Sequence, residues 1–247
     1  MSWVEEAKRR SAEAAAEHVE SGSIIGLGSG STALHFVHIV GSRLRSGELE
    51  DILGVPTSQR TAAEAKEAGI TLTSLDEHPE LDLSVDGADQ INGELDAIKG
   101  GGGALLREKV VASASETYII IVDERKLTSR LGEEFPLPIE ILPFSLGAVK
   151  RKLESMRVRA SLRTTKGTTG PFVTDNGNYI LDADFGYIAE PRVLDGQLKE
   201  MPGVLETGLF IDYANVAYVG TPKGVRAMRR PGDKSRQLEN AMPKRNR

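Results

Sequence analysis

Short apolar strands alternate with amphipathic helices along the first half of this chain, at the spacing typical of parallel sheets. Strands are expected at residues 24–27, 52–55, 70–75, 81–85 and 118–122. Helices are expected at residues 2–20, 33–44, 62–68 and 105–114. Because strands that are separated by helices usually pair in parallel, this order predicts an α/β fold with a doubly wound, Rossmann-like, mostly parallel sheet.

The pattern changes after Leu131, where Pro136-Leu137-Pro138 opens a second kind of segment. We expect strands at 139–142, 157–162 and 179–182, helices at 145–156 and 193–200, and a hairpin turn at Asp175-Asn176-Gly177-Asn178. This β-α-β-β-α order predicts a ferredoxin-like α+β sandwich inserted at residues 132–205. Residues 1–131 and 206–228 would then form the Rossmann-like domain, to which strands at 208–211 and 216–219 return.

Composition and charge exclude several classes of protein. The chain has no cysteine, which excludes disulfides, thiolate metal sites and cysteine nucleophiles. Its apolar runs are too short to span a bilayer and its N-terminus lacks a signal-peptide pattern, so we expect a cytoplasmic protein without membrane contact. The net charge is −5, but residues 223–247 are strongly basic and leave about −12 on the rest. We therefore expect no nucleic-acid partner, and we interpret residues 229–247 as a basic, flexible tail rather than a contact arm.

Two carboxylates, Asp86 and Asp89, follow the strand at residues 81–85, at the end where open parallel sheets bind their ligands. The run from Gly100 to Gly103 can then bring several backbone amides to bear on an anion. The next helix carries Glu108 near its first or second turn, where it can face back toward the glycine run. A flexible hinge flanked by solvated charges is the alternative, although hinges rarely need an apolar strand that leads into paired aspartates.

A second glycine-rich turn, Gly28-Ser29-Gly30-Ser31-Thr32, joins the strand at 24–27 to a helix and can present amides to a phosphate. The following strand runs into Thr57-Ser58-Gln59-Arg60-Thr61, whose hydroxyls and arginine suit a phosphate or a sugar. A dinucleotide-binding fingerprint would need glycine where the chain has Ser31, and an acidic residue about twenty positions further on. Lys126, which follows the strand at 118–122, either reaches the same crevice or lies in solvent.

Seven segments with these features occur in one order along about residues 5 to 222: Gly26-Leu27-Gly28-Ser29-Gly30-Ser31-Thr32-Ala33, Thr57-Ser58-Gln59-Arg60-Thr61, Asp86-Gly87-Ala88-Asp89, Lys99-Gly100-Gly101-Gly102-Gly103-Ala104, Glu108-Lys109, Thr174-Asp175-Asn176-Gly177-Asn178, and Pro202-Gly203-Val204-Leu205-Glu206-Thr207-Gly208-Leu209-Phe210. Individually these motifs are modest signals. In this combination they resemble the signature segments of the type A ribose-5-phosphate isomerase family.

The resemblance implies a cofactor-free aldose-ketose isomerase of the pentose phosphate pathway that interconverts ribose 5-phosphate and ribulose 5-phosphate through an enediolate. Glu108 matches the family's general base, Asp86 and Asp89 its acidic pair for ring opening and sugar hydroxyls, and Lys99 a group that steadies the oxyanion. The substrate contacts that it implies are Ser29, Gly30, Ser31, Thr32, Asp86, Gly87, Ala88, Asp89, Lys99, Gly100, Gly101, Gly102 and Lys126. The family also implies a homodimer or homotetramer.

The residues agree with this chemistry without the family. Proton removal next to a carbonyl needs a carboxylate base of raised pKa and positive groups near the developing oxyanion. No metal is expected, because His35 and His38 lack a third ligand nearby and no cluster of histidines and carboxylates is evident. A sugar-phosphate sensor remains an alternative, as does an amino-sugar phosphate deaminase, which would be expected to show a catalytic histidine. A dehydrogenase is the least favoured reading.

Overall fold

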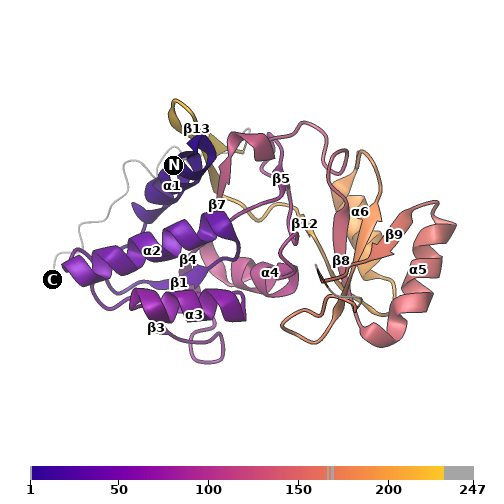
Figure 1. The fold of residues 1–247 in the computed structure, drawn as a ribbon, viewed down its shortest axis with the longest axis horizontal. Coiled ribbons are helices and arrows are strands. Elements are labelled where there is room, and N and C mark those ends of the chain that lie inside the picture. The colour runs from indigo at the N-terminus through magenta and orange to yellow at the C-terminus, as the bar shows by residue number, and fades with distance from the viewer. Residues whose placement is uncertain (1, 166, 168–169, 231–247) are drawn as a thin grey trace.

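The computed structural model describes residues 2–165, 167 and 170–230 (Figure 1). Its largest feature is a seven-stranded sheet in which β13 and β14 pair antiparallel and every other neighbouring pair is parallel. In spatial order the strands are β14 (Gly224–Arg229), β13 (Val216–Thr221), β7 (Ser115–Asp123), β4 (Leu81–Asp86), β1 (Ile24–Leu27), β2 (Leu53–Pro56) and β3 (Thr71–Leu72). The predicted α/β fold with a mostly parallel sheet is confirmed.

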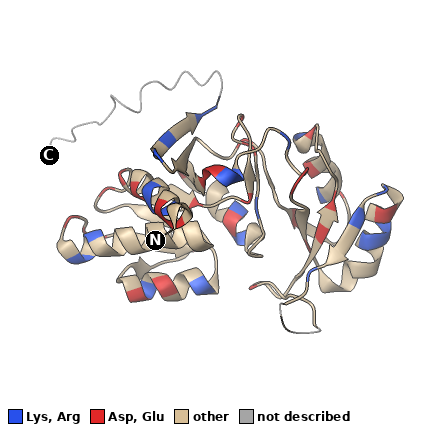
Figure 2. Ribbon diagram, turned by 45° about the horizontal axis from the view of Figure 1, so that its top comes forward, with Lys and Arg blue, Asp and Glu red and all other residues tan. Residues whose placement is uncertain are grey.

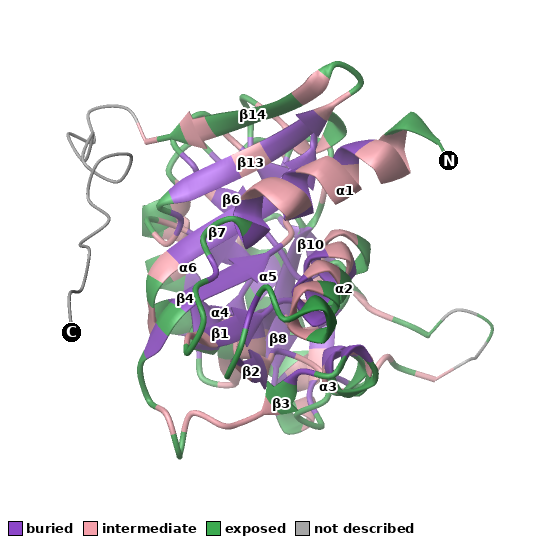
Figure 3. Cartoon of the chain, turned by 90° about the vertical axis from the view of Figure 1, so that its left-hand side faces the viewer, coloured by how far each residue is buried: buried purple, intermediate pink, exposed green. Residues whose placement is uncertain are grey.

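Side chains alternate across this sheet, so each face has its own hydrophobic core. Ile119 and Ile121 of β7 point toward α1 (Trp3–Ala16), α2 (Ser31–Ser46) and α3 (Gln59–Ala68). Ile120 and Val122 point to the opposite face, which is covered by α4 (Leu105–Ser113). Figure 3 shows the central strands as buried, with the helices around them. The sheet is therefore wound on both faces, as the alternating sequence predicts.

The segment after Leu131 forms a separate four-stranded antiparallel sheet, which lies beside the main sheet in Figure 1. Along the chain its elements are β8 (Leu137–Ile141), the short helix η2 (Pro143–Ser145), α5 (Leu146–Ser155), β9 (Arg159–Leu162), β10 (Tyr179–Asp184), α6 (Pro191–Lys199) and β11 (Val204–Thr207). The spatial order β11-β8-β10-β9 is that of a ferredoxin-like sandwich, and β11 adds a strand that the sequence did not predict.

A third, three-stranded sheet links the two larger ones. It consists of β12 (Leu209–Phe210), β6 (Ala97–Ile98) and β5 (Gln90–Ile91), and a short helix η1 (Glu124–Lys126) follows β7. Residues 208–211, predicted to return to the Rossmann-like domain, pair there with β6 rather than with the seven-stranded sheet, because β13 already occupies the edge of β7. The predicted turn at 174–178 forms, but no strand precedes it, since both edges of β10 are taken by β8 and β9.

Several predicted boundaries shift. The first helix ends at Ala16 rather than at residue 20, and β3 contains two residues rather than six. β11 runs to Thr207, two residues past the predicted end of the insertion at residue 205. β14 ends at Arg229, which places the predicted start of the tail inside the sheet, and basic positions on this strand are blue in Figure 2. Residues 231–247 of the predicted tail lie outside the described residues. The division into a domain of residues 1–131 and 206–228 and an insertion of residues 132–205 stays a prediction.

Candidate active site

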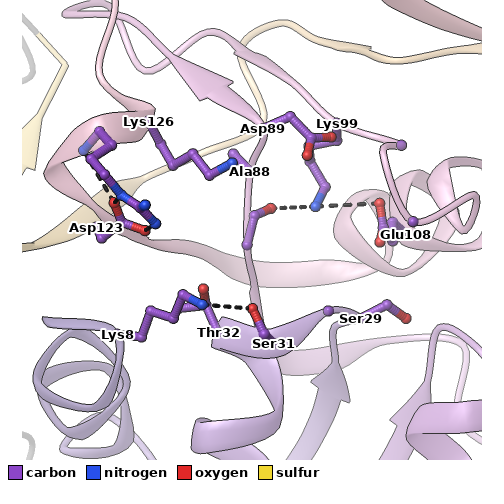
Figure 4. Close-up of a pocket in the computed structure, with 15 residues that line it drawn as sticks. Lys8, Ser29, Ser31, Thr32, Ala88, Asp89, Lys99, Glu108, Asp123 and Lys126 are labelled. Atoms are coloured by element: carbon purple, nitrogen blue, oxygen red, sulfur yellow. Dashed lines mark hydrogen bonds and ion pairs between the residues drawn. The ribbon is translucent and has the colours of Figure 1, made fainter. Parts of the chain in front are cut away.

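The candidate site lies where β1 and β4, paired side by side in the sheet, reach their carboxyl ends. The chain leaves β1 toward α2 on one face, whereas the passage after β4 leads to α4 on the other face. This is the topological switch point at which open α/β sheets bind ligands. A cavity of about 200 Å³ opens there (Figure 4).

Twelve predicted residues line this cavity together. They are Ser29, Gly30, Ser31, Thr32, Gly87, Ala88, Asp89, Lys99, Gly100, Gly102, Glu108 and Lys126. Asp86 lies directly behind the lining. Gly101 is also outside the lining, and its amide donates to Asp89 Oδ2 at 2.7 Å. The two glycine-rich loops and the acidic passage, far apart in sequence, therefore meet at one site.

Ser29 ties the glycine-rich loop at residues 28–32 to the end of the neighbouring strand β2. Its hydroxyl lies 2.8 Å from the hydroxyls of Thr57 and Ser58 and 3.2 Å from that of Thr61. The predicted pairing of the two loops is therefore seen, with Thr57 and Thr61 buried as supports rather than as cavity lining. Arg60, in contrast, is exposed and does not line the cavity.

The helix α2 begins at Ser31, directly after Gly30, which has a φ of +95°. Its first turn leaves backbone N–H groups without helical partners, and its dipole places partial positive charge there. Lys8 of α1 brings its amine to this end, where it donates to the Ser31 hydroxyl at 3.0 Å and pairs with Glu5 at 2.8 Å. This end of the cavity is suited to an anion such as a phosphate.

Asp86, at the end of β4, is 2% exposed and accepts backbone hydrogen bonds from Ser29 at 3.0 Å and Gly87 at 2.7 Å. Gly28 has to be glycine here, since a Cβ at this position would lie 2.3 Å from the Asp86 carboxyl carbon. The loop after β1 can therefore pack directly on this carboxylate, which fixes the position of Asp86.

Lys99 is the cation shared by the two buried carboxylates. Its amine lies 3.1 Å from Asp86 Oδ2. It also lies 3.3 Å from Glu108 Oε2 and donates to the Gly87 carbonyl (Figure 4). Lys99 and Glu108 are 3% and 5% exposed. One buried positive charge thus faces two acidic groups, so both cannot be ionised without leaving a net negative charge.

Burial shifts the titration of this cluster. Burial, and after it the nearby Asp86, raise the pKa of Glu108 from its ordinary 4.5 to about 8, while Lys99 opposes both. Burial likewise raises the pKa of Asp86, against the pull of Lys99. Burial lowers the pKa of Lys99, but Asp86 and Glu108 outweigh it and hold that pKa above its ordinary range. Glu108 is therefore a carboxyl poised to exchange a proton near neutral pH.

The sequence reasoning missed three lining residues, Lys8, Asp123 and Arg125. Arg125 pairs with Asp123, its Nε lying 2.6 Å from Oδ1. Asp123 is the last residue of β7 and begins a charged run from which only Lys126 was predicted to reach the site. Lys8 gave no local signal, because it is one of several charged residues on an amphipathic helix and reaches the site only through packing of α1 on α2.

The histidines do not gather at the cavity. His35 and His38 lie on α2 and contact Glu5 at 3.3 Å and Glu64 at 3.1 Å, respectively. Within the part of the chain that the structure describes, no three or more histidine or carboxylate side chains are grouped so as to hold a metal ion. Nor is any helix among those residues long and apolar enough to cross a membrane.

A family model described as ribose 5-phosphate isomerase A (phosphoriboisomerase A) matches residues 53–224. The chain belongs to this family. A curated ribose-5-phosphate isomerase A from Rhodopseudomonas palustris (strain BisB18) is 51% identical over 232 residues, which span 92% of this chain and 99% of the relative. Another from Thermococcus kodakarensis is 44% identical over 227 residues, with the same two coverages.

Solved structures of the family also share the fold. A D-ribose-5-phosphate isomerase in complex with phospho-erythronic acid superposes with a TM-score of 0.90 at 41% identity, covering 93% of this chain and 100% of that one. The ribose 5-phosphate isomerase of Plasmodium falciparum gives a TM-score of 0.87 at 36% identity, with coverages of 92% and 99%. Membership of the ribose-5-phosphate isomerase A family therefore holds for both sequence and fold.

Proposed function

We propose that this chain, as a ribose-5-phosphate isomerase, interconverts ribose 5-phosphate and ribulose 5-phosphate by metal-free proton transfer with Glu108 as the base. The observation that carries the proposal is that Glu108 lines the cavity while being 5% exposed, 3.3 Å from Lys99, with a pKa raised to about 8. A base with such a pKa can take a proton from carbon and return it at physiological pH.

The step balances within the substrate. In the open-chain aldose, Glu108 removes the proton on C2, the electron pair forms the C1=C2 bond, and the C1 carbonyl oxygen becomes an enediolate oxyanion. Glu108 then returns the proton to C1, while the proton of the C2 hydroxyl moves to the C1 oxygen and C2 becomes the ketone. C1 is reduced and C2 is oxidised, so no external electron donor or acceptor is needed.

Lys99 is proposed to stabilise the oxyanion. Its buried amine keeps a full positive charge, and a cation in a site with little water stabilises a developing negative charge strongly. Asp86 holds this amine from behind the lining, so we assign it the positioning of Lys99. We assign the half-buried carboxylate of Asp89, which lines the cavity, to the sugar hydroxyls. The lining glycines Gly100 and Gly102 bring backbone close to the substrate.

The phosphate is proposed to bind at the other end of the cavity. The first turn of α2 offers backbone amides without helical partners, together with the hydroxyls of Ser31 and Thr32. Lys8 and Lys126 line the same end and supply charge, and Figure 4 shows both side chains reaching toward the cavity. The relative solved with phospho-erythronic acid, an acid with a phosphate, supports a sugar-phosphate ligand for this site.

The test is conversion of ribose 5-phosphate to ribulose 5-phosphate by the purified chain, with Glu108→Gln measured in parallel. Gln keeps the size of the side chain but cannot accept the proton, so kcat should fall by roughly 10²-fold or more. Conversion by the wild type together with a wild-type kcat for Glu108→Gln would remove Glu108 from the role of base. An inactive wild type would reject the proposed activity itself.

We also propose that the chain works as a homodimer or homotetramer, as the family implies. Phe144 in η2 is 95% exposed and Leu142 beside it is 44% exposed, which is the apolar surface expected of a contact between copies. Light scattering in solution tests this proposal, and a strict monomer at enzyme concentrations used in assays would reject it.

A further inference from the structure

Arg163, the residue after β9 in the insertion, reaches across to the glycine run of the site. Its Nη1 donates to the carbonyl oxygen of Gly100 at 2.6 Å and to that of Gly101 at 3.2 Å. Its Nε donates to Asp182 Oδ2 at 2.9 Å, and Nη2 donates to Asp182 Oδ1. The Arg163 side chain is 14% exposed and that of Asp182 is 23% exposed. A bidentate ion pair with Asp182 therefore fixes the guanidinium, and the guanidinium in turn binds the two carbonyl oxygens.

The glycine run needs hydrogen bonds from other segments because it has no side chains of its own to fix its conformation. Gly100 has a φ of +102° and Gly103 a φ of +83°, both in the region that glycine enters freely and other residues rarely adopt. A chain of glycines can take many backbone conformations, and fixing one of them costs entropy that other contacts have to offset. Contacts from outside the run therefore select its conformation.

Because each peptide group is planar, a hydrogen bond that fixes one carbonyl also fixes the direction of the next backbone N–H. In a trans peptide the carbonyl of one residue and the N–H of the next point in opposite directions, and the described residues contain no cis peptide bond. With the Gly100 carbonyl on Arg163, the Gly101 N–H must point away from Arg163, and it donates to Asp89 Oδ2 at 2.7 Å. The Gly101 carbonyl directs the Gly102 N–H away from Arg163 in the same manner, and Gly102 lines the cavity.

We propose that Arg163, held by Asp182, is a positioning residue for the isomerase reaction. It turns the Gly101 amide onto Asp89 and the Gly102 amide toward the substrate oxygen, and so it transmits the fold of the insertion to the site. The inference rests on the proposed function of the cavity. It assigns the insertion a part in the chemistry, although Arg163 itself touches no reacting atom.

The chain offers a matched control on the same two strands. Arg159 of β9 pairs with Asp184 of β10, its Nη2 lying 2.7 Å from Oδ2, but its side chain is 90% exposed and makes no contact with the glycine run among the described residues. Arg163→Met and Arg159→Met remove the same charge and the same kind of ion pair from neighbouring positions. Only the first variant releases the carbonyls of Gly100 and Gly101.

The first measurement is steady-state kinetics on ribose 5-phosphate. Arg163→Met should lower kcat by about tenfold or more, because misplacing one oxyanion donor costs up to about 10²-fold to 10³-fold, while KM changes by less than about threefold. Arg163→Lys should not restore kcat, since one ammonium cannot hold a carboxylate and two carbonyls in a fork. Arg159→Met should keep kcat within about twofold of the wild type. A wild-type kcat for Arg163→Met, or equal losses in both Met variants, would overturn the proposal.

The second measurement needs no substrate, so it separates this inference from the proposed function. The amide hydrogen of Gly101 should exchange with solvent faster in Arg163→Met than in the wild type or in Arg159→Met. Unchanged exchange at Gly101 overturns the proposal even if the wild type isomerises ribose 5-phosphate. If Arg163→Met does not fold, Asp182→Asn tests the same point, with a smaller loss of kcat and faster Gly101 exchange expected, and wild-type values for both overturning the proposal.

Discussion

Arg107 Nε donates a hydrogen bond of 2.7 Å to Asn176 Oδ1, which ties the residue next to Glu108 to the turn at 174–178 of the insertion. The same turn reaches α3, since Asp175 Oδ2 accepts a hydrogen bond of 2.7 Å from the Gln59 amide. One turn therefore contacts both the helix that carries the proposed base and the helix that begins beside Ser29. The turn therefore supports both helices although it does not line the cavity.

Glu140 of β8 organises that turn from within the insertion. It is fully buried, and its Oε1 accepts hydrogen bonds from Thr174 Oγ1 at 2.9 Å, Asn176 Nδ2 at 3.1 Å and Asn178 Nδ2 at 2.9 Å. Glu140→Ala leaves the buried donors of Thr174 and Asn178 unpaired and should lower the free energy of unfolding by about 3 kcal/mol in urea titrations. Glu140→Gln keeps the acceptor and should cost about 1 kcal/mol or less. Equal losses in the two variants would contradict this role for Oε1.

The pH dependence of the reaction should follow Glu108. The base works as a carboxylate, and its pKa is raised to about 8 by burial and by Asp86. The ionised fraction therefore increases as the pH rises toward 8, and kcat/KM should rise about tenfold per pH unit below that point. A rate profile that is flat from pH 6 to pH 9 would contradict the raised pKa.

The same shift predicts how stability depends on pH. The folded-state pKa of Glu108 lies above the ordinary 4.5, so the folded state binds more protons between pH 4.5 and about 8. The contribution of the neutral carboxyl to stability is complete below about pH 4.5 and is lost as the pH rises toward 8. Glu108→Gln removes this loss, so its unfolding free energy relative to the wild type should increase from pH 5 to pH 8. A constant difference across this range would contradict the shift.

Lys8 should act on binding rather than on the chemical step. Lys8→Met removes a charged donor from the proposed phosphate end, so KM for ribose 5-phosphate should rise about tenfold with kcat within about threefold. Arg10→Met is the matched control, because Arg10 lies on the same helix and pairs with Glu6 at 2.9 Å without lining the cavity. Equal KM values in the two variants would remove Lys8 from phosphate binding.

Removal of metal should leave the reaction intact. The proposed step uses Glu108 and Lys99 for proton transfer and oxyanion stabilisation, so neither role is left for a metal ion. We expect full activity after dialysis against EDTA, measured as conversion of ribose 5-phosphate. An activity that is lost in EDTA and restored by a divalent cation would contradict the proposal.

Much of the fold could be predicted because local patterns and final pairing agree. The strand at 24–27 is a continuous apolar run and α4 places Leu105, Val111 and Ala112 on a buried side, so parallel pairing follows from the alternation of such elements. β5 and β6, with two residues each, carry no such pattern and exist only through pairing with each other and with β12. β14 was missed because it is an edge strand whose side chains are mostly exposed, so residues 224–229 carry no apolar pattern.

The residues of the site also fall into those that could be predicted from the sequence and those that could not. Glycine runs and carboxylates after strands mark a ligand-binding edge, so Asp89, Lys99 and Glu108 could be predicted from their places along the chain. Lys8 and Arg163 could not, since each lies on a different element and reaches the site only through tertiary packing. Sequence motifs identify groups that the chemistry needs, whereas residues that position those groups depend on the full fold.

The most direct test of the account is the transfer of solvent deuterium to carbon during the reaction in D₂O, measured by NMR for the wild type and for Glu108→Gln. The enediolate route predicts that the wild type places deuterium on C1 of ribulose 5-phosphate and on C2 of ribose 5-phosphate, because Glu108 exchanges its proton with solvent at the open cavity. It predicts that Glu108→Gln slows this exchange by roughly 10²-fold or more. Conversion by the wild type without any carbon-bound deuterium, or exchange at the wild-type rate in Glu108→Gln, would contradict the central claim.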